Sequence, residues 1–327
     1  MRKIIILFLI AVMTITTFGC EKKQDDLITV RLSEVVHSVF YAPQYVALNK
    51  GFFEEEGLNI EFTTAWGADK VVTAIVSGNA DIGLAGAEAT IYVYDGGKED
   101  HLVNFAQLTQ KDGSFLVGRE DEDFSWKNLG GKTIIGGRPG GMPEITLEHI
   151  LKENSLEPHE DLEVITNIAF TATAGAFASG TGDYVALFEP TASSMELQGF
   201  KVLSSIGKDS GELPYTVYMA EKSYIQENPL IVQKFTNAIY KALMWVEEHT
   251  AEEIAKEVHP YFEETDFELI KMSVQRYKDQ DIWDKNPILE TASFDYLQSI
   301  IKESGHLEEK IDSNIVIDNT FAYEAVK

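Results

Sequence analysis

Cysteine is nearly absent from this chain of 327 residues, in which Cys20 is the single example. One cysteine excludes an intrachain disulfide, a structural zinc site built from thiolates and a redox pair of thiols. Histidine is also sparse, and the seven histidines do not follow the spacing of metal ligands. We therefore expect neither a bound metal nor a cofactor.

Basic residues are few: the chain has 27 Lys and Arg and 53 Asp and Glu, which gives a formal net charge of −26. Such a chain lacks the positive charge that neutralises phosphates, which excludes nucleic acid as a partner. Anionic lipid would also repel it unless a covalent anchor held it at a membrane. The hydrophobic fraction of 44% is sufficient for a sizeable core, and the length suggests two domains of about 150 residues each.

Long apolar runs are missing as well, apart from a short one near the N-terminus. Arg2 and Lys3 precede an apolar stretch over 4–13, which is too short for a comfortable transmembrane helix and is typical of a secretory signal. With Gly19 directly before Cys20, the segment resembles a bacterial lipoprotein signal, in which the cysteine becomes the lipidated first residue of the mature chain.

That signal most often has Leu three positions before the cysteine, where this chain has Thr17. An ordinary signal peptide with an incidental cysteine is the alternative. We predict a signal peptide over 1–19, lipidation at Cys20 and a polar, lipidated tether over 20–27. The mature protein is then expected at the extracytoplasmic face of the cell membrane, held there by lipid.

From residue 28 the chain alternates between strand and helix patterns, which predicts parallel β-α-β units and an α/β fold. The tail beyond residue 228 is expected to be almost entirely helical and to pack back on the first domain. The predicted strands cover 28–34, 58–65, 81–86, 101–109, 114–119, 132–137, 162–168, 183–190, 200–207 and 214–220. The predicted helices cover 41–53, 67–78, 87–97, 142–154, 171–180, 228–248, 250–258, 265–281 and 292–304.

Three segments carry a family resemblance: FYAPQYVALNKGFFEEEGLNIEF over 40–62, SGNADIGLAGAEA over 77–89 and NLGGKTIIGG over 128–137. In this order they resemble the substrate-binding proteins of ABC importers. The most similar branch includes binders of taurine and other sulfonates, nitrate and the pyrimidine precursors of thiamine. The resemblance extends from residue 28 to about residue 305.

The resemblance implies a two-lobed periplasmic-binding-protein fold of type II, in which a hinge of two crossover strands joins the lobes and a ligand cleft lies between them. Lobe one is expected to contain residues 28–109 together with 211–327, and lobe two residues 110–210. ABC permease and ATPase subunits are the implied partners of a monomeric binding protein.

Ligands of open parallel sheets bind beyond the carboxyl ends of the strands, where helix N-termini offer free N–H groups. Five predicted loops satisfy this condition: 34–41, 65–69, 86–89, 137–142 and 188–191. We therefore predict one ligand pocket, with contacts from these loops and from the returning crossover strand. The predicted ligand-binding residues are His37, Phe40, Tyr41, Trp66, Gly67, Gly86, Glu88, Arg138, Gly140, Gly141, Met142, Glu189 and Tyr215.

Several of these residues have an alternative structural role. His37 can be an ordinary loop histidine, and Trp66 can pack between the lobes instead of stacking on a ligand. Glu88 can compensate the dipole of a helix N-terminus. Arg138 can form a salt bridge on an acidic surface, and Glu189 can be an exposed carboxylate near a helix start.

Two further aromatic residues are expected near the hinge and the cleft. Tyr215 is expected to line the hinge, and Trp283 can cap the cleft.

The ligand itself has two candidate chemistries. Aromatic groups such as Tyr41 and Trp66, together with the acceptor carboxylates Glu88 and Glu189, suit a flat nitrogen heterocycle such as an aminopyrimidine-like thiamine precursor. Arg138 and helix N-termini would instead suit a sulfonate, taurine or nitrate. A carboxylate facing a buried anion is repelled, so the heterocycle is favoured.

An enzyme is a third possibility, of a different class. The chain has neither a GxSxG nucleophile elbow nor an HExxH motif. A pyrimidine synthase related to this fold uses a cysteine-rich motif, which one cysteine cannot supply. A binding protein that is not an enzyme is therefore predicted.

Overall fold

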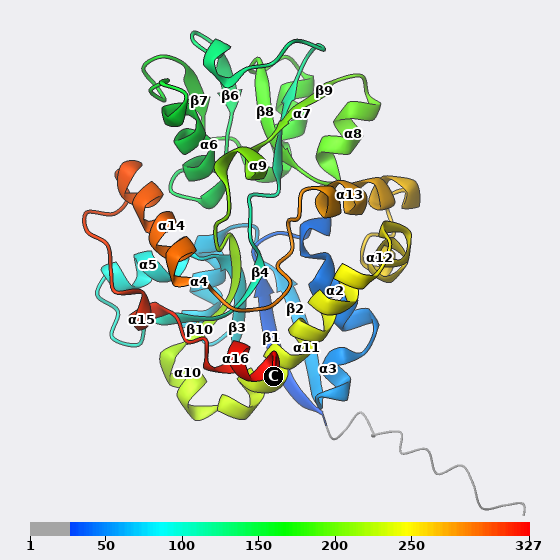
Figure 1. Cartoon of the computed structure of the whole chain (residues 1–327), viewed down its shortest axis with the longest axis vertical. Helices are drawn as coiled ribbons and strands as arrows, with labels where there is room; N and C mark the ends of the chain where they lie inside the picture. The colour runs from blue at the N-terminus through cyan, green and yellow to red at the C-terminus, as the bar shows by residue number, and fades with distance from the viewer. Residues whose placement is uncertain (1–26) are drawn as a thin grey trace, which may run out of the picture.

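The computed structural model describes residues 27–327 and shows two lobes, each built around a five-stranded sheet (Figure 1). The predicted signal peptide, the predicted lipidation site Cys20 and most of the predicted tether lie outside the described residues. Among the described helices, not one has the length and apolar character needed to cross a membrane.

The first sheet has the strand order β2-β1-β3-β10-β4 and the second has the order β7-β6-β8-β5-β9. In the first sheet β1 runs parallel to β2 and β3, and in the second β6 runs parallel to β7 and β8. The strands are β1 (Ile28–Glu34), β2 (Leu58–Thr64), β3 (Ile82–Gly86), β4 (Leu102–Thr109), β5 (Ser114–Gly118), β6 (Thr133–Ile135), β7 (Glu163–Ile165), β8 (Tyr184–Phe188), β9 (Lys201–Ser205) and β10 (Thr216–Glu221).

The two sheets share one topological feature, because each receives a strand directly from the other lobe. Strand β5 enters the second sheet antiparallel to β8 and β9, and β10 returns to the first sheet antiparallel to β3 and β4. The alternation of strands and helices predicts parallel units from residue 114 onward as well, and this was wrong for β5. The direction of these two strands follows from the crossover between lobes, which local sequence does not encode.

Helices cover both sheets and fill the C-terminal tail. The α-helices are α2 (Ala42–Asn49), α3 (Phe52–Glu55), α4 (Ala68–Val76), α5 (Glu88–Asp95), α6 (Met142–Glu153), α7 (Thr173–Ala178), α8 (Thr191–Leu197), α9 (Ile206–Ser210), α10 (Lys222–Glu227), α11 (Pro229–Glu248), α12 (Ala251–Val258), α13 (Phe267–Asp279), α14 (Thr291–Glu303), α15 (Ser313–Val316) and α16 (Thr320–Ala325). Two short 3-10 helices also matter for the site, η2 (Val39–Tyr41) and η4 (Phe170–Ala172).

The side chains of β5 show how the second lobe builds its core. Phe115 and Val117 belong to the large core cluster that runs through both lobes, whereas Leu116 belongs to a separate cluster with α6 residues such as Leu147. Successive residues of a strand point to opposite faces of its sheet. All five residues of β5 are buried, and its three central positions, Phe115, Leu116 and Val117, are apolar on both faces of the sheet.

The two connections between the lobes lie side by side. The N–H of Leu213 donates to the carbonyl of Gln110 at 2.8 Å, and the N–H of Tyr215 donates to the carbonyl of Thr109 at 3.1 Å. A third segment joins them, because the N–H of Gln110 donates to the carbonyl of Ile282 at 2.9 Å. The hinge therefore includes the stretch after α13 in addition to the two crossovers.

The C-terminal helices reach both lobes. Helix α12 packs on α2 of the first lobe, whereas α13 contacts both η2 of the first lobe and α8 of the second. Helix α14 contacts α5 on one side of the cleft and α6 on the other. Figure 1 shows α13 and α14 at the level where the upper and lower lobes meet.

Candidate functional site: a cavity between the lobes

A cavity of about 720 Å³ lies between the lobes, at the carboxyl ends of β1, β2, β3, β6 and β8. Its volume is within the range of pockets that hold small organic ligands. It is lined by Val35, Val36, Phe40, Tyr41, Trp66, Gly67, Ala68, Asp69, Val72, Gly86, Glu88, Ala89, Tyr92, Val93, Gly137, Arg138, Pro139, Gly140, Gly141, Met142, Pro143, Phe170, Phe188, Tyr215, Thr216 and His306. All five predicted loops contribute to this lining, together with the crossover strand β10.

Phe40 and Tyr41 are the buried aromatic residues of η2, which begins at Ser38. The Ser38 hydroxyl accepts a hydrogen bond from the Phe40 N–H at 3.2 Å and so caps the short helix. The Phe40 ring lies over Gly113, where a side chain would collide with it. Both rings are almost completely buried but line the cavity, so they form part of its wall.

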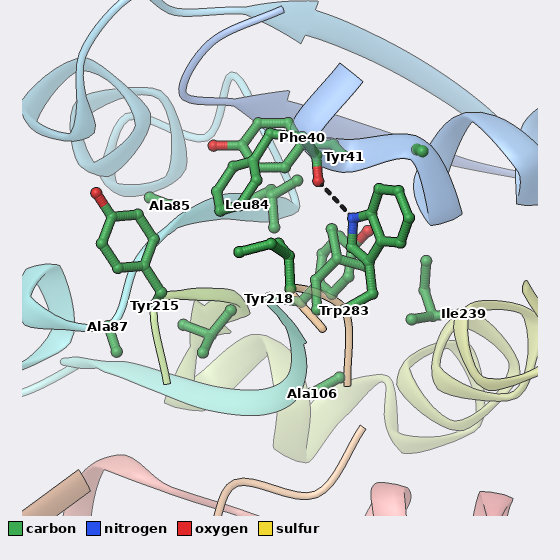
Figure 2. Packing of buried hydrophobic residues seen from close by; sticks show 14 of the residues in the cluster. Phe40, Tyr41, Leu84, Ala85, Ala87, Ala106, Tyr215, Tyr218, Ile239 and Trp283 are labelled. Carbon is green, nitrogen blue, oxygen red and sulfur yellow. Dashed lines mark hydrogen bonds between the residues drawn. The ribbon is translucent and has the colours of Figure 1, made fainter. Parts of the chain in front are cut away.

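Trp283 supports this aromatic wall from behind. Its indole N–H donates to the carbonyl oxygen of Phe40 at 2.8 Å, as Figure 2 shows. The indole also packs edge-to-face with Tyr277, with ring centroids 5.9 Å apart. Trp283 lies outside the residues that line the cavity, so it positions Phe40 and does not cap the cleft.

Trp66 and Phe170 are the exposed aromatic residues of the cavity. Trp66 is 45% exposed and Phe170 is 41% exposed, although both line the cavity. Trp66 has φ of 60°, in the left-handed region that bulky residues rarely adopt. An exposed apolar ring in an unusual backbone conformation beside a cavity is well suited to stacking on a flat ligand.

Glu88 is the buried acid of the cavity. It starts α5, and its carboxyl group folds back over Gly86, where a side chain would collide with it. Within residues 27–327, Oε2 of this carboxyl group has no hydrogen-bond partner. Burial raises the pKa of Glu88 to about 7, while hydrogen bonds from the backbone N–H groups of Glu88, Met142 and Ala89 oppose the rise.

The proximity of Met142 is informative, because Met142 begins α6 in the second lobe. The Glu88 carboxyl group therefore lies near the N-termini of two helices, one from each lobe. Glu88 is therefore placed to compensate the dipole of a helix N-terminus, the role that was predicted as the alternative to ligand binding. Its carboxyl group also lines the cavity. At neutral pH it is available both as an acid and as a carboxylate.

Tyr215 is the second buried polar residue of the cavity. Its ring packs against Phe40, with centroids 5.8 Å apart, and its hydroxyl has no partner in hydrogen-bonding geometry among the described residues. Burial and the nearby charge of Asp112 hold the pKa of Tyr215 well above its usual value. The Asp112 carboxylate lies beside this hydroxyl and is not among the residues that line the cavity.

Arg138 reaches across the cleft and forms an ion pair with the other lobe. Its Nη1 lies 3.0 Å from Oδ1 of Asp69, which belongs to the other lobe. The guanidinium also covers Gly67, where a side chain would collide with it. Near this pair the hydroxyl of Tyr92 donates to the carbonyl of Gly140 at 3.1 Å. These two interactions link the lobes across the cavity.

Two N–H groups of the glycine-rich loop before α6 are bonded to neighbouring residues of the same segment. The N–H of Gly140 donates to Oε2 of Glu144 at 2.6 Å, and the N–H of Gly141 donates to the carbonyl of Arg138 at 3.1 Å. A loop with satisfied donors is a poor anion site. Of the features that the sequence offered for an anion, Arg138 is therefore paired with Asp69, whereas the N-terminus of α6 reaches the cavity at Met142.

His37 was predicted at the cavity, and the structure places it elsewhere. Its Nδ1 lies 2.9 Å from Oε1 of Glu34, its Nε2 lies 2.8 Å from the carbonyl oxygen of Tyr261, and its ring stacks on Phe262. Burial opposes the charged ring, but the bonds to Glu34 and Tyr261 raise the pKa of His37 overall. Because Glu34 is a fully buried acid at the end of β1, it holds the histidine away from the cleft.

Glu189 was also predicted at the cavity and lies outside it. Its carboxylate accepts hydrogen bonds from Arg276 Nη1 at 2.7 Å, from the Ser193 N–H at 3.0 Å and from the Ser193 hydroxyl at 2.8 Å. The side chain is 1% exposed. A buried carboxylate needs charged and hydrogen-bonding partners, and α13 and α8 provide them on the side away from the cavity.

Tertiary structure adds cavity residues that the sequence analysis missed. His306 follows α14, and its Nε2 lies 3.7 Å from Oε2 of Glu144 across the cleft. Only the packing of the C-terminal tail brings it there. Tyr92 follows Glu88 by one helical turn, so the periodicity of α5 was the signal that could have found it.

The two lobes, their crossed connections and the cavity between them define the protein as one of the two-lobed solute-binding class. The model of the family described as NMT1/THI5 like matches residues 39–253. The chain belongs to this family.

Three comparisons illustrate the relationship. A Bacillus subtilis protein named as a binding protein, YtlA, is 46% identical over 303 residues, which is 92% of this chain and 91% of the relative. A 4-amino-5-hydroxymethyl-2-methylpyrimidine phosphate synthase from Saccharomyces cerevisiae is 26% identical over 63% of both chains. The alkanesulfonate-binding protein SsuA of Xanthomonas axonopodis, bound to MOPS, superposes with a TM-score of 0.72 at 14% identity, covering 90% of this chain and 99% of that one.

The superposition supports the type II periplasmic-binding-protein fold and, at this identity, only the fold. The high identity to YtlA extends along nearly the whole chain, which supports a binding role. The match to the yeast synthase relates the same family to an enzyme.

Proposed function

We propose that this protein is the extracytoplasmic substrate-binding lipoprotein of an ABC importer and that it binds a flat nitrogen heterocycle of the aminopyrimidine type. The Glu88 carboxyl group carries the ligand assignment, because it is buried in the cavity wall with one oxygen unpaired. An aminopyrimidine presents a ring nitrogen beside an amino group. A carboxylic acid can donate to the nitrogen and accept from the amino group at the same time.

Two further observations support the heterocycle over an anion. The Tyr215 ring forms part of the cavity wall beside Phe40, while Trp66 and Phe170 offer exposed faces for stacking. Arg138 is paired with Asp69, and the N–H groups of Gly140 and Gly141 are bonded to neighbouring residues of the same segment. The printed name of the yeast relative contains an aminopyrimidine, which agrees with this chemistry.

A sulfonate or nitrate is the second candidate. The fold neighbour from Xanthomonas holds MOPS, which is a sulfonate. For an anion to bind here, Arg138 would have to leave Asp69, and Glu88 would have to be protonated because a carboxylate repels a buried anion, a condition that the heterocycle shares.

The deciding experiment is calorimetry on protein freed of ligand by unfolding and refolding, titrated with a 4-aminopyrimidine and with an alkanesulfonate. We expect binding of the aminopyrimidine, weakened about ten- to hundredfold in Glu88→Gln by the loss of one charged or acidic hydrogen bond. Asp284→Asn is the matched control, because burial also raises the pKa of Asp284, to about 6, at a site outside the cavity. Tight binding of the sulfonate that Glu88→Gln leaves unchanged or improves would contradict the heterocycle.

The enzyme alternative is tested in the same samples, because a binding protein returns the heterocycle chemically unchanged on prolonged incubation. Conversion of the ligand by purified protein would contradict the binding role. Lipid anchoring is a separate part of the proposal and rests on Gly19 and Cys20 in the sequence.

A further inference from the structure

A shallow groove continues from the cavity along helices α4 and α5, which pack against each other. On α4 the cavity is lined by Ala68, Asp69 and Val72, and the groove by Val72, Thr73, Val76 and Ser77. On α5 the cavity is lined by Glu88, Ala89, Tyr92 and Val93, and the groove by Tyr92, Val93 and Gly96. Residues three and four apart share a helix face, so cavity and groove lie on one continuous stripe of each helix.

The walls of this groove are mostly apolar. Val72, Val76 and Val93 line it, and Val76 is 41% exposed at its outer end. The basic residue at the same end, Lys98, is paired with Glu221, with Nζ and Oε1 3.2 Å apart. The groove therefore presents apolar surface without a charge available for an anionic group.

The cavity is also larger than the proposed polar head requires. A single substituted six-membered ring at Glu88 fills only part of about 720 Å³. Valine and alanine side chains of α4 and α5 continue outward from Glu88 toward the groove. A ligand that consisted of the head alone would leave this apolar path empty.

We propose that the ligand has two parts: a polar aromatic head at Glu88 and an apolar substituent that leaves the cavity along the α4–α5 groove. The proposal rests on the proposed function for the position of the head. The continuity of the stripe from Glu88 to Val76 specifies where the substituent lies. The substrate class is therefore a nitrogen heterocycle that carries an alkyl or aryl group, not a bare pyrimidine.

The test measures affinity as a function of chain length. Calorimetry would compare 4-aminopyrimidines that carry methyl, propyl and pentyl groups on the ring, and in parallel methane-, propane- and pentanesulfonate. We expect affinity to rise about two- to fourfold per methylene in the series whose head binds, as apolar surface leaves water. Val76→Glu should flatten this rise and leave the affinity of the methyl compound unchanged.

Ile28→Glu is the matched control, because Ile28 is 44% exposed on β1 and lies outside both cavity and groove. It should change neither the affinity nor its dependence on chain length. Because both substituted positions are exposed, both variants should fold as the wild type does.

The possible failures are distinguishable. If the methyl compound binds but longer chains add nothing, the groove proposal is wrong and the proposed head stands. If only the sulfonates bind, with the same rise and the same effect of Val76→Glu, the head assignment is wrong and the groove stands.

If the rise in affinity with alkyl chain length is unaltered in Val76→Glu, the alkyl chain of the ligand lies elsewhere and the groove proposal is overturned. The groove proposal is also overturned if affinity does not depend on chain length and Val76→Glu impairs uptake, because the groove would then be a contact for the permease. If no compound of either series binds, both proposals fail.

Discussion

Glu189 and Arg276 join the two lobes through an ion pair in which Oε1 and Nη1 are 2.7 Å apart, with the Glu189 carboxylate buried and the Arg276 side chain half-buried. Glu189 follows β8 in the second lobe, and Arg276 lies on α13, which follows the return of the chain to the first lobe. Arg276 also binds Glu196 of α8 through Nη2 at 2.6 Å. A carboxylate that the sequence offered as a ligand contact thus helps to hold the lobes together.

This pair predicts a stability effect. Arg276→Met should lower the free energy of unfolding by about 3 kcal/mol, because it leaves the Glu189 carboxylate buried without its cation. Arg31→Met is the control: the Arg31 side chain is 45% exposed in its pair with Asp81, and the loss should stay below about 1 kcal/mol. Urea denaturation of the two variants measures the difference. Equal losses would show that burial does not distinguish the two pairs.

Glu88 predicts how stability changes with pH. Its carboxyl group has a pKa of about 7 in the folded protein against 4.5 for the ordinary group, so the folded state holds the proton more tightly. The resulting stabilisation is complete below about pH 4.5 and is lost as the pH rises to about 7. It amounts to roughly 3 kcal/mol.

Denaturation of wild type and Glu88→Gln between pH 4.5 and pH 8 measures this loss. The wild type should become less stable relative to the variant as the pH rises, because glutamine does not ionise. A constant difference across the range would contradict the raised pKa.

The same proton should govern ligand affinity. If Glu88 donates to the ring nitrogen, only the protonated protein is competent, and apparent affinity falls with the protonated fraction. Between pH 6 and pH 8.5 a group with a pKa of about 7 should lose about ten- to thirtyfold in affinity for a heterocycle that stays neutral. Calorimetry at the two pH values tests this, and an affinity that rises with pH would assign the donor role to the ligand instead.

Trp66 predicts a binding effect without a stability effect. Trp66→Ala should weaken the heterocycle about tenfold, since it removes the stacking surface. Because the side chain is 45% exposed, the unfolding free energy should change little. Leu197→Ala, at a residue 72% exposed and away from the cavity, serves as control. A large loss of stability with unchanged affinity would make Trp66 a packing residue between the lobes.

Cys20 predicts localisation. Cys20→Ser should move the protein from the membrane fraction into the periplasm or the medium, because the thiol that would carry the lipid is removed. Thr17→Leu, which restores the more common residue of the signal, should leave the protein in the membrane fraction. Unchanged fractionation of Cys20→Ser would contradict lipid anchoring.

The sequence alone determined the order of the elements and the position of the loops. The alternating pattern of β1 and the glycines at the ends of α4 and α7 are local signals, and the structure has the predicted strands and longer helices at nearly the predicted places. The short helices α8, α9 and α10 were not predicted, and α9 begins where the predicted strand over 200–207 ends. Since parallel strands end at the same edge of a sheet, their following loops were predicted to meet, and the cavity is built from those loops. Trp66 and Glu88 were found in this way.

Only the tertiary structure decided which charged side chains face the cavity. Glu88 and Glu189 both follow apolar strands, yet one lines the cavity and the other is bound by Arg276, 87 residues further along the chain. Arg138 likewise forms an ion pair with Asp69, which lies 69 residues before it in the chain. A charge removed from water requires a partner wherever the fold provides one, and such partners come from distant segments whose proximity local sequence patterns do not specify.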